Sequence, residues 1–414
     1  MSPSKFVIEG LAGAKTLEGE IPVRGAKNAA LKALAASVLF EDTVTFENMP
    51  QIEDVKRMEE LLVGVLAGDT TLKRDIAERM RASVVLTGPV LARHGTVTFP
   101  FPGGCVLGER PIDLFLQGFR AMGAEVKEEE ELFHLTATGG KLTGAKIFFP
   151  FISVTATETL MLAAVLAEGE TVLMNAAMEP EIPWLAEYLN ACGADITGAG
   201  TSTITIKGGG LLRTGGKPCV ILPDRIEAGS FMILAALAGK EVKISHCEPE
   251  HIGALLTLFR RAGVDMDVGK DYVTVRGTKP NSEYKLVSAR THEYPGFPTD
   301  LQAPYALFMT QCTGEGTLLE TIFDGRFRYT DELVRMGAKV TVMNPHKILV
   351  RGPRELSRKD LEGPDLRAGL AYILAATIAT GTSTVRNAYV IDRGYEHIEE
   401  RLQKLGLNIK REEA

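Results

Sequence analysis

The sequence predicts an α/β protein of two similar domains, each built from three copies of one repeat unit. The first observation behind this prediction is a helix end followed by a glycine and a strand, which recurs at residues 121–126, 191–196, 261–266, 335–340 and 404–409. The second is a series of helices that are apolar on nearly every side, at residues 28–40, 157–167, 227–238, 300–312 and 365–379, with a sixth opening at 80–95.

Each unit is expected to contain a strand, a helix, a strand, a second helix and two paired strands. A helix that is apolar all round is buried, so we expect the first helix of each unit to lie inside, with sheets around it. The second helices, such as residues 52–62 and 394–406, alternate apolar and charged residues at helical spacing and should be partly exposed.

Three copies fall within residues 21–222 and three within 223–414, which predicts two domains with residues 1–20 belonging to the second. The short strand KFVIEG at the N-terminus is left over from the count and is expected to pair with the C-terminal domain. The first copy runs from residues 61–68 directly into 69–83 and omits the glycine and strand-strand ending. That copy is therefore predicted to be trimmed.

Composition excludes several classes of function. The 414 residues are 45% hydrophobic with a formal net charge of −7, which argues against bulk attraction to nucleic acid. No apolar run is long enough for a signal peptide or a membrane span, so we expect a cytoplasmic protein without membrane insertion. Five cysteines without a CxxC pair and seven scattered histidines predict neither disulfides nor a metal site. The glycine runs match no Walker or dinucleotide motif.

Lys27 and Asn28 stand where a strand and tight turn lead into the first apolar helix. Asn28 is the expected helix cap, and Lys27 beside it would add a positive charge to the free amides of a helix start. This arrangement suits a phosphate, although a plain capped helix with a solvated lysine explains the same residues.

Asp300 follows two prolines and is expected to cap another apolar helix. Asp224 and Asp365 occupy the same place in other repeats, so the repeat explains most of these acids. A capping carboxylate that faces a cleft can also accept a proton. The spacing does not tell which acid performs chemistry.

Three arginines, Arg81, Arg367 and Arg393, lie at junctions between loops and helices, where each is either a surface ion pair or an anion ligand. Cys105 lies on a loop rich in glycine and proline, five residues before Arg110. A guanidinium beside this thiol would depress its pKa and make it a usable acid or nucleophile. We interpret the other four cysteines as packing residues.

The motifs GAKNAALKALAAS, MRASVVLTGPVLARHG, PGGCVLGERPIDL, AMEPEIPWLAEYL, PGFPTDLQA, DLRAGLA and IDRGYEHIEERLQKLG follow one another over nearly the whole chain. Together they resemble the family of enolpyruvyl transferases that act on UDP-N-acetylglucosamine. The resemblance implies two inside-out α/β domains, each of three βαβαββ repeats with pseudo-threefold symmetry, and an active site in the cleft between them.

The resemblance also implies a reaction. The 3-hydroxyl of UDP-N-acetylglucosamine adds to C2 of phosphoenolpyruvate, C3 is protonated and phosphate leaves, which opens peptidoglycan synthesis. No metal or organic cofactor is implied, and the implied partners are these two small molecules.

Residue roles follow from the same resemblance. Cys105 would protonate C3 and react with the epoxide fosfomycin, and Asp300 would receive the hydroxyl proton. Lys27 and Asn28 would belong to the phosphoenolpyruvate site. The remaining implied contacts are Arg110 and Arg393 to its phosphate or carboxylate, Arg81 on the substrate side, Arg110, Pro111, Ile112, Asp113, Leu114, Ser153 and Val154 to the nucleotide, Ile322 to the sugar, and Asp365 with Arg367 as a supporting pair.

Three segments depart from the family pattern. Thr155 stands where the family usually has a glycine in SVGAT, residues 148–152 lack a lysine found in some relatives, and the turn reads RGAKN rather than SGAKN. Two alternatives therefore stay open. One is a 5-enolpyruvylshikimate-3-phosphate synthase, which usually carries a GSKS-type turn and lacks the matching cysteine. The other is a non-catalytic regulatory paralogue that binds nucleotide sugar.

Overall fold

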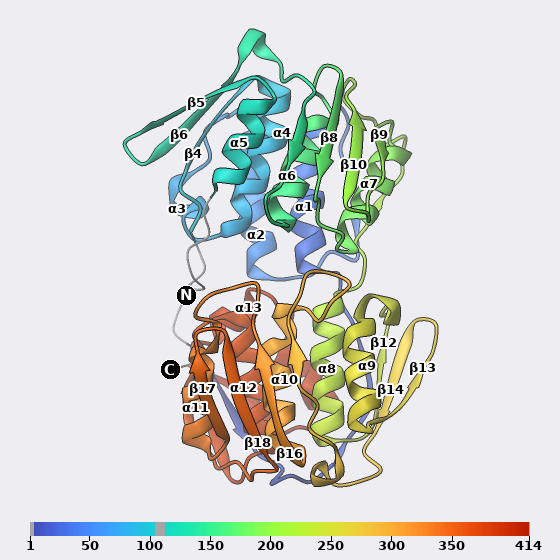
Figure 1. The fold of residues 1–414 in the computed structure, drawn as a ribbon, viewed down its shortest axis with the longest axis vertical. Coiled ribbons are helices and arrows are strands. Elements are labelled where there is room, and N and C mark those ends of the chain that lie inside the picture. The colour runs from blue at the N-terminus through green and yellow to red at the C-terminus, as the bar shows by residue number, and fades with distance from the viewer. Residues whose placement is uncertain (1–3, 104–111, 414) are drawn as a thin grey trace. The chain divides into compact units, whose positions relative to one another are not determined.

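The computed structural model describes residues 4–103 and 112–413, which form two compact units (Figure 1). The C-terminal unit contains residues 4–24 and 223–413, and the N-terminal unit contains residues 25–103 and 112–222. The unit boundary follows Arg24 because strand β2 (Leu17–Pro22) pairs in parallel with β12 (Gly239–Ser245) of the C-terminal half.

The C-terminal unit has three four-stranded sheets with one shared pairing order. Each begins with a parallel pair at one edge and continues with two antiparallel pairings. In order from the parallel edge, the sheets are β2, β12, β14 (Tyr272–Arg276) and β13 (Asp265–Val268); β15 (Ala289–Arg290), β16 (Gly314–Leu319), β18 (Lys347–Gly352) and β17 (Lys339–Asn344); and β19 (Asp360–Glu362), β20 (Thr382–Arg386), β1 (Ser4–Glu9) and β21 (Ile409–Glu413).

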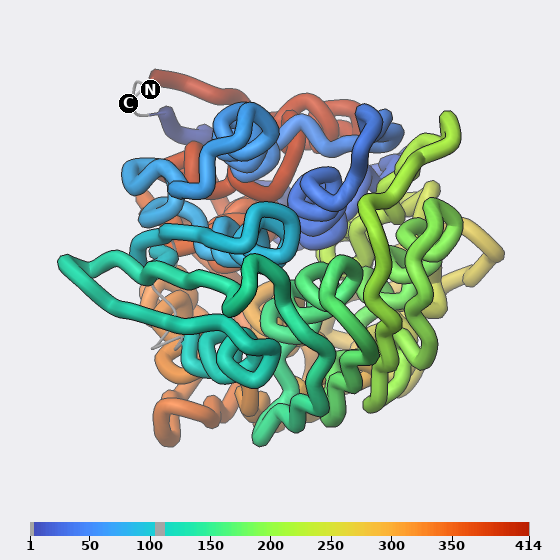
Figure 2. Tube along the Cα trace, turned by 90° about the horizontal axis from the view of Figure 1, so that it is seen from above, coloured from blue at the N-terminus to red at the C-terminus, as the bar shows by residue number. Residues whose placement is uncertain are grey.

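The two ends of the chain complete the third of these sheets. Strand β1 lies between β20 and β21 and pairs antiparallel with both, with Phe6 opposite Val385 and Arg411. In the other two sheets these two positions are filled by a hairpin. The leftover N-terminal strand therefore supplies the strand that the last repeat lacks, and its predicted pairing is confirmed. The N and C labels lie close together in Figure 2.

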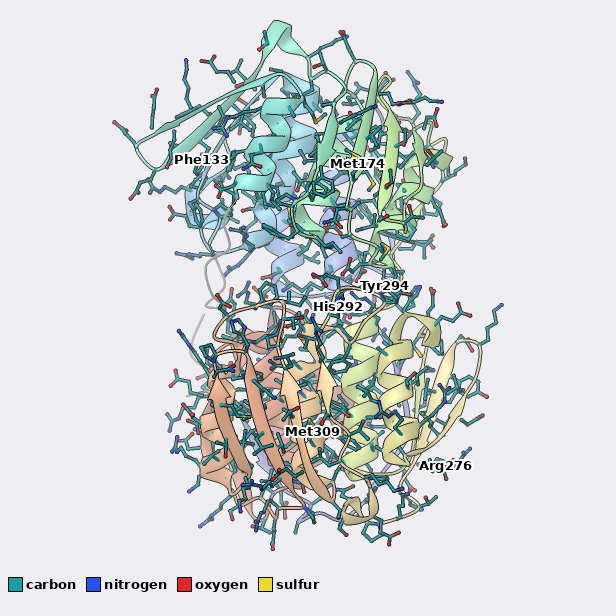
Figure 3. The ribbon with its side chains drawn as sticks, viewed as in Figure 1. Phe133, Met174, Arg276, His292, Tyr294 and Met309 are labelled. Atoms are coloured by element: carbon teal, nitrogen blue, oxygen red, sulfur yellow. The ribbon has the colours of Figure 1, made fainter. Side chains whose placement is uncertain are left out.

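Three buried helices form the centre of the C-terminal unit and pack on one another. They are α8 (Arg225–Ala238), α10 (Gln302–Gln311) and α12 (Leu366–Ile378). In Figure 3, Met309 on α10 lies inside the unit, whereas Arg276 on β14 reaches outward. The outer helices, each with one exposed face, are α9 (Gly253–Ala262), α11 (Thr330–Met336) and α14 (Ile398–Lys404); α13 (Ala388–Asp392) is a short further helix.

The N-terminal unit repeats this plan with inner helices α1 (Lys27–Ala36), α4 (Thr87–His94) and α6 (Val154–Ala164). Its outer helices are α2 (Glu53–Leu66), α5 (Asp113–Ala121) and α7 (Glu181–Ala191), with α3 (Arg74–Ala77) a short helix between α2 and α4. The sheets are β7 (Lys146–Phe148), β8 (Glu170–Met174), β10 (Thr203–Lys207) and β9 (Asp195–Thr197); β4 (Thr96–Pro100), β6 (Leu132–Ala137) and β5 (Ala124–Glu129); and the parallel pair β3 (Phe46–Glu47) and β11 (Cys219–Val220).

The β3–β11 pair is the shortened sheet of the first copy. Within the described residues it has the parallel pair found at the edge of the four-stranded sheets but not their antiparallel hairpin. The chain passes from α2 to α3 without a strand, whereas at least one strand follows each of the other outer helices.

The recurring glycine of the repeat ends five outer helices in a left-handed conformation. Its φ lies between +82° and +115° at all five positions, which are Gly123, Gly193, Gly263, Gly337 and Gly406. Residues with a Cβ rarely adopt this conformation, and a glycine that adopts it ends a helix and redirects the chain. This is why the glycine recurs in the sequence where an outer helix turns into a strand.

Candidate active site

Lys27 is the first residue of α1, and its Nζ lies 2.7 Å from Oδ2 of Asp54 in the first turn of α2. Both side chains are buried, with only 8% of Lys27 and 2% of Asp54 exposed. An ammonium this desolvated keeps its charge only beside a partner such as this carboxylate. The sequence did not single out Asp54.

The prediction that Asn28 caps this helix is wrong. The helix begins one residue earlier, and Ala26 occupies the capping position without a side-chain cap. Asn28 lies inside the first turn and is half-buried. The start of α1 is therefore a helix N-terminus without a side-chain cap, next to a buried lysine, which is a suitable setting for an anion.

Asp300 accepts hydrogen bonds from two buried arginines of the C-terminal unit. Arg326 donates from Nη2 to Oδ1 at 2.8 Å, and Arg367 donates from Nε to Oδ2 at 3.0 Å. The Asp300 side chain is 28% exposed, whereas those of Arg326 and Arg367 are 3% and 6% exposed. The two buried arginines thus hold the carboxylate in place, and part of the Asp300 side chain remains accessible to solvent.

The prediction that Asp300 caps a helix is also wrong. Asp300 lies in a single helical turn, Thr299–Leu301, and α10 begins after it without a side-chain cap. Its carboxylate is turned to the two arginines instead. Asp224 and Asp365 do cap α8 and α12, each accepting from two backbone amides at 2.8–3.1 Å.

A second layer of polar groups orients this cluster. Arg367 donates from Nη1 to the buried Tyr395 hydroxyl at 2.8 Å, and Arg326 donates from Nη1 to Thr299 Oγ1 at 2.7 Å. The fully buried Glu320 accepts from Thr299 Oγ1 at 2.8 Å and from the amide of Ile322 at 2.8 Å. Ile322, the expected sugar contact, is thereby tied to the same network as Asp300.

Both arginines stay charged. Burial by itself lowers the pKa of Arg367, but its interactions with Tyr395 and Asp300 outweigh burial and raise that pKa above its ordinary value. Burial also opposes the charge of Arg326, and Asp300 and Asp365 raise its pKa in compensation. The sequence did not single out Arg326, which lies 26 residues from Asp300 in a segment without a helix-start signal.

The remaining predicted residues are divided between the units. Arg81 begins a helical turn in the N-terminal unit and donates to the carbonyl of Pro102 at 3.3 Å. Arg393 follows α13 in the C-terminal unit and is half-buried. Cys105, Arg110 and Pro111 lie outside the described residues.

Two segments expected to contact the nucleotide begin helices of the N-terminal unit. Ile112 and Leu114, at the start of α5, are buried, and Asp113 between them is exposed. Ser153 caps α6, since its Oγ accepts from the amide of Ala156 at 3.3 Å, and Val154 is the first residue of that helix. A ligand at these segments would meet helix starts and the Asp113 carboxylate.

Thr155, which replaces the family's glycine, lies in the first turn of α6. Its φ is not positive, so the backbone here does not require a glycine. Two residues before Ser153, the phenyl ring of Phe151 is 55% exposed. The departures therefore change the side chains presented beside this helix start and leave its backbone regular.

The four described cysteines are buried, as expected of packing residues: Cys192, Cys219, Cys247 and Cys312. Burial raises the pKa of the Cys219 thiol to about 12 and that of Cys247 to about 11. Since the thiolate is the reactive form, these thiols are inert at neutral pH.

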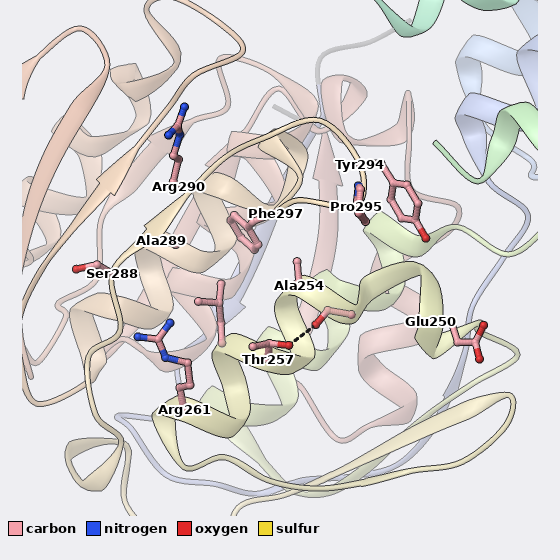
Figure 4. A pocket seen from close by; sticks show the side chains of 12 residues that line it. Glu250, Ala254, Thr257, Arg261, Ser288, Ala289, Arg290, Tyr294, Pro295 and Phe297 are labelled. Atoms are coloured by element: carbon pink, nitrogen blue, oxygen red, sulfur yellow. Dashed lines mark hydrogen bonds between the residues drawn. The ribbon is translucent and has the colours of Figure 1, made fainter. Parts of the chain in front are cut away.

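A separate cavity of about 620 Å³ lies in the C-terminal unit between α9 and residues 288–297 (Figure 4). Arg261 and Arg290 lie toward one end and Glu250 and Tyr294 toward the other. Among the described residues predicted to bind substrate, none lines this cavity. Its apolar middle and exposed rim differ from the buried ionic cluster at Asp300.

Within residues 4–103 and 112–413, no group of three or more His, Cys, Asp or Glu side chains is arranged to hold a metal ion. In the same described part of the chain, no helix has both the length and the apolar character needed to cross a lipid bilayer.

Comparison with known proteins adds to this geometry. A sequence profile of the family described as EPSP synthase (3-phosphoshikimate 1-carboxyvinyltransferase) matches residues 11–402. The UDP-N-acetylglucosamine 1-carboxyvinyltransferase of Acidobacterium capsulatum is 45% identical, with 98% of this chain and 96% of the relative covered. The protein of the same name from Klebsiella pneumoniae strain 342 is 41% identical, covering 96% of this chain and 97% of the relative.

Solved structures share the fold. The enolpyruvyl transferase NikO from Streptomyces tendae matches with a TM-score of 0.86 at 25% identity, over 100% of both chains. An EPSP synthase from Acinetobacter baumannii matches with a TM-score of 0.72 at 18% identity, over 99% of this chain and 100% of that one. Because its identity is only 18%, the second match supports the fold and nothing beyond it.

Proposed function

The chain belongs to the enolpyruvyl transferase family, and from this premise we propose that it transfers the enolpyruvyl group of phosphoenolpyruvate to the 3-hydroxyl of UDP-N-acetylglucosamine with release of phosphate. The observation that carries this conclusion is the 41–45% identity, over nearly the full length, to transferases named for that nucleotide sugar. The reaction forms a precursor for peptidoglycan synthesis.

The chemistry is an addition followed by an elimination. The sugar oxygen bonds to C2 of phosphoenolpyruvate while C3 gains a proton, and the sugar hydroxyl loses its own proton. A proton then leaves C3 and the C2–O bond to phosphate breaks, which restores the double bond. No electron donor or acceptor is required, and the main task of the protein is to place protons and stabilise charge.

We propose Asp300 as the group that receives the hydroxyl proton. Arg326 and Arg367 stabilise its ionised form, and a base must be ionised before it accepts a proton. The same two contacts weaken its basicity.

Positive groups would hold the two anionic ends of phosphoenolpyruvate. The uncapped start of α1 with Lys27 and Asn28 suits the phosphate. Arg393 and Arg110 would add charge, and Cys105 would donate the proton to C3. The residues proposed for the reaction come from both units.

Segments of the N-terminal unit would bind the nucleotide. The start of α6, with Ser153 and Val154, offers a helix N-terminus, and Asp113 at the start of α5 offers an exposed carboxylate for base or ribose donors. Arg110 and Pro111, which precede Ile112 in the sequence, are proposed to contact the same ligand. Arg81 would contact the substrate from the same unit, with Ile322 on the sugar side.

Phosphate release tests this function. The purified protein is mixed with phosphoenolpyruvate and either UDP-N-acetylglucosamine or shikimate 3-phosphate, and inorganic phosphate is measured over time. We expect phosphate release in the reaction with UDP-N-acetylglucosamine and none in the reaction with shikimate 3-phosphate. Release only with shikimate 3-phosphate would assign the chain to the sister activity, and release with neither would favour a non-catalytic protein.

A further inference from the structure

Two ionisable side chains meet in the interior of the N-terminal unit, away from the Lys27–Asp54 pair. Nζ of Lys32 on α1 lies 3.1 Å from Oε2 of Glu158 on α6, and the two side chains are 8% and 1% exposed. The other buried residues of these two helices are apolar except for Lys27, Thr157 and Thr159. An ion pair placed here costs desolvation that an apolar pair would avoid, so its presence calls for a reason other than stability.

The charged groups that act on Glu158 include more negative than positive charge. Lys32 on α1 is the facing cation, whereas Glu179 and Glu181 at the start of α7 add negative charge. The pKa of Glu158 is raised to about 7, mainly by burial; Lys32 opposes the rise, and Glu181 and Glu179 add to it. The other charged residues of elements packed on α6 lie at element ends: Arg81, Arg93, His94, Asp113, Arg120, Glu170 and Lys207.

The Lys32–Glu158 pair lies at a similar distance along each helix from the starts of α1 and α6, which are the two proposed binding segments. Lys32 follows Lys27, the first residue of α1, by five residues, and Glu158 follows Ser153, the residue that caps α6, by five residues. Each is therefore about 7.5 Å along the helix axis from that residue. Lys27 and Asn28 are proposed to hold phosphoenolpyruvate, and Ser153 and Val154 the nucleotide. The contact between Lys32 and Glu158 would therefore set the distance between the start of α1 and the start of α6.

We propose that Lys32 and Glu158 are positioning residues, whose ionic contact sets the spacing between the phosphoenolpyruvate end at α1 and the nucleotide end at α6. The inference rests on the proposed function of these two helix starts. Neither residue touches substrate in this account. Their effect is on the alignment of two bound molecules, to which rates are more sensitive than the affinity of either molecule alone.

Three variants test the proposal: Glu158→Gln, Lys32→Met and the double variant Lys32→Met/Glu158→Gln. Each keeps approximate side-chain size and removes charge. We expect kcat to fall about 10-fold or more in all three, with KM for each substrate within about 2-fold of wild type. We also expect the double variant to regain thermal stability lost in Lys32→Met, because it leaves no unpaired buried charge.

The matched control is Arg93→Met. Arg93 donates from Nη1 to the carbonyls of Val38 and Phe40 at 2.7 and 2.8 Å, so it ties the end of α4 to the turn that follows α1. This substitution removes a partly buried cation of the same unit at the opposite end of α1. We expect a lower melting temperature with kcat within 2-fold of wild type. A loss of kcat in Arg93→Met equal to that in Glu158→Gln would overturn the proposal, as would recovery of kcat together with stability in the double variant.

The dependence of kcat on pH distinguishes the proposed role from a purely structural one, because a loss of packing alone would not change this dependence. Protonation of Glu158 ends its ionic contact, so wild-type kcat should decline as pH falls through about 7 and approach the value of Glu158→Gln. The decline should be absent in that variant. An unchanged profile in Glu158→Gln would refute the positioning role. Absence of any phosphate release by the wild-type protein would instead be a failure of the proposed function, which separates the two.

Discussion

The guanidinium of Arg367 holds the carboxylate of Asp300 from two nitrogens, with Nε and Nη2 both 3.0 Å from Oδ2. The two residues are 67 positions apart and belong to the starts of two different inner helices, α12 and the turn before α10. Packing of those helices at the centre of the C-terminal unit therefore creates the contact. The same packing brings Arg326 to the other carboxylate oxygen.

Replacement of Arg367 by lysine is expected to impair the reaction although it keeps the charge. Lysine offers a single ammonium in place of the planar guanidinium, so it cannot bind Asp300 and Tyr395 in the present geometry. We expect kcat to fall at least 10-fold in Arg367→Lys, measured by phosphate release. The control is Arg386→Lys, an exposed arginine of the same unit paired with Asp360, which should change kcat less than 2-fold. Equal effects in the two variants would contradict this role of Arg367.

Asp54→Asn is expected to weaken binding of phosphoenolpyruvate. The variant removes the negative charge 2.7 Å from Nζ of the buried Lys27, which Asp54 helps to hold at the start of α1. KM for phosphoenolpyruvate should rise about 10-fold. Glu53→Gln, which alters the neighbouring acid that pairs with exposed Lys56, is the control and should keep the wild-type KM. An unchanged KM in Asp54→Asn would show that Asp54 does not support Lys27.

Thermal stability should decline as pH rises from about 4.5 to 7. The pKa values of Glu158 and Glu227 are raised from 4.5 to about 7, mainly by burial. Within this window the folded protein binds protons that the unfolded chain has released, so the contribution is complete at lower pH and lost as pH approaches 7. The linked free energy is up to about 3 kcal/mol for each group. Melting temperatures of wild type and Glu227→Gln across pH 5–8 measure it, and parallel curves would exclude the Glu227 contribution.

Fosfomycin should modify one cysteine of the native protein. The four described thiols are buried, and burial raises their pKa values, so they present little thiolate. Intact-mass analysis should show a single adduct, and peptide mapping should place it on Cys105. Cys105→Ser should give no adduct. Modification of Cys192 or Cys219 instead would contradict the proposed location of the phosphoenolpyruvate site.

Much of the fold follows from patterns visible in the sequence. The all-round apolar segments predict the inner helices, and Gly263 and Gly337 mark where outer helices end. The count of repeats also predicts that the first copy is trimmed and that the N-terminal strand pairs with the C-terminal half. These features depend on periodicity within short windows, which a single sequence records directly.

The details of the site could not be predicted in the same way. Local rules assigned Asn28 and Asp300 as helix caps, but the first helix begins before Asn28, and Asp300 binds Arg326 and Arg367 instead. Those contacts join residues 26 and 67 positions apart, and their partners are decided by tertiary packing. Asp54, beside Lys27, was missed for the same reason. The roles of Cys105, Arg110 and Pro111 rest on the resemblance.

A single competition reaction tests the central claim most directly. Phosphoenolpyruvate is supplied with equal concentrations of UDP-N-acetylglucosamine and shikimate 3-phosphate, and the products are resolved by mass spectrometry while phosphate is measured. We predict enolpyruvyl UDP-N-acetylglucosamine in an amount equal to the phosphate released, with shikimate 3-phosphate recovered unchanged. Enolpyruvyl transfer to shikimate 3-phosphate, or phosphate release without the nucleotide-sugar product, would contradict the account.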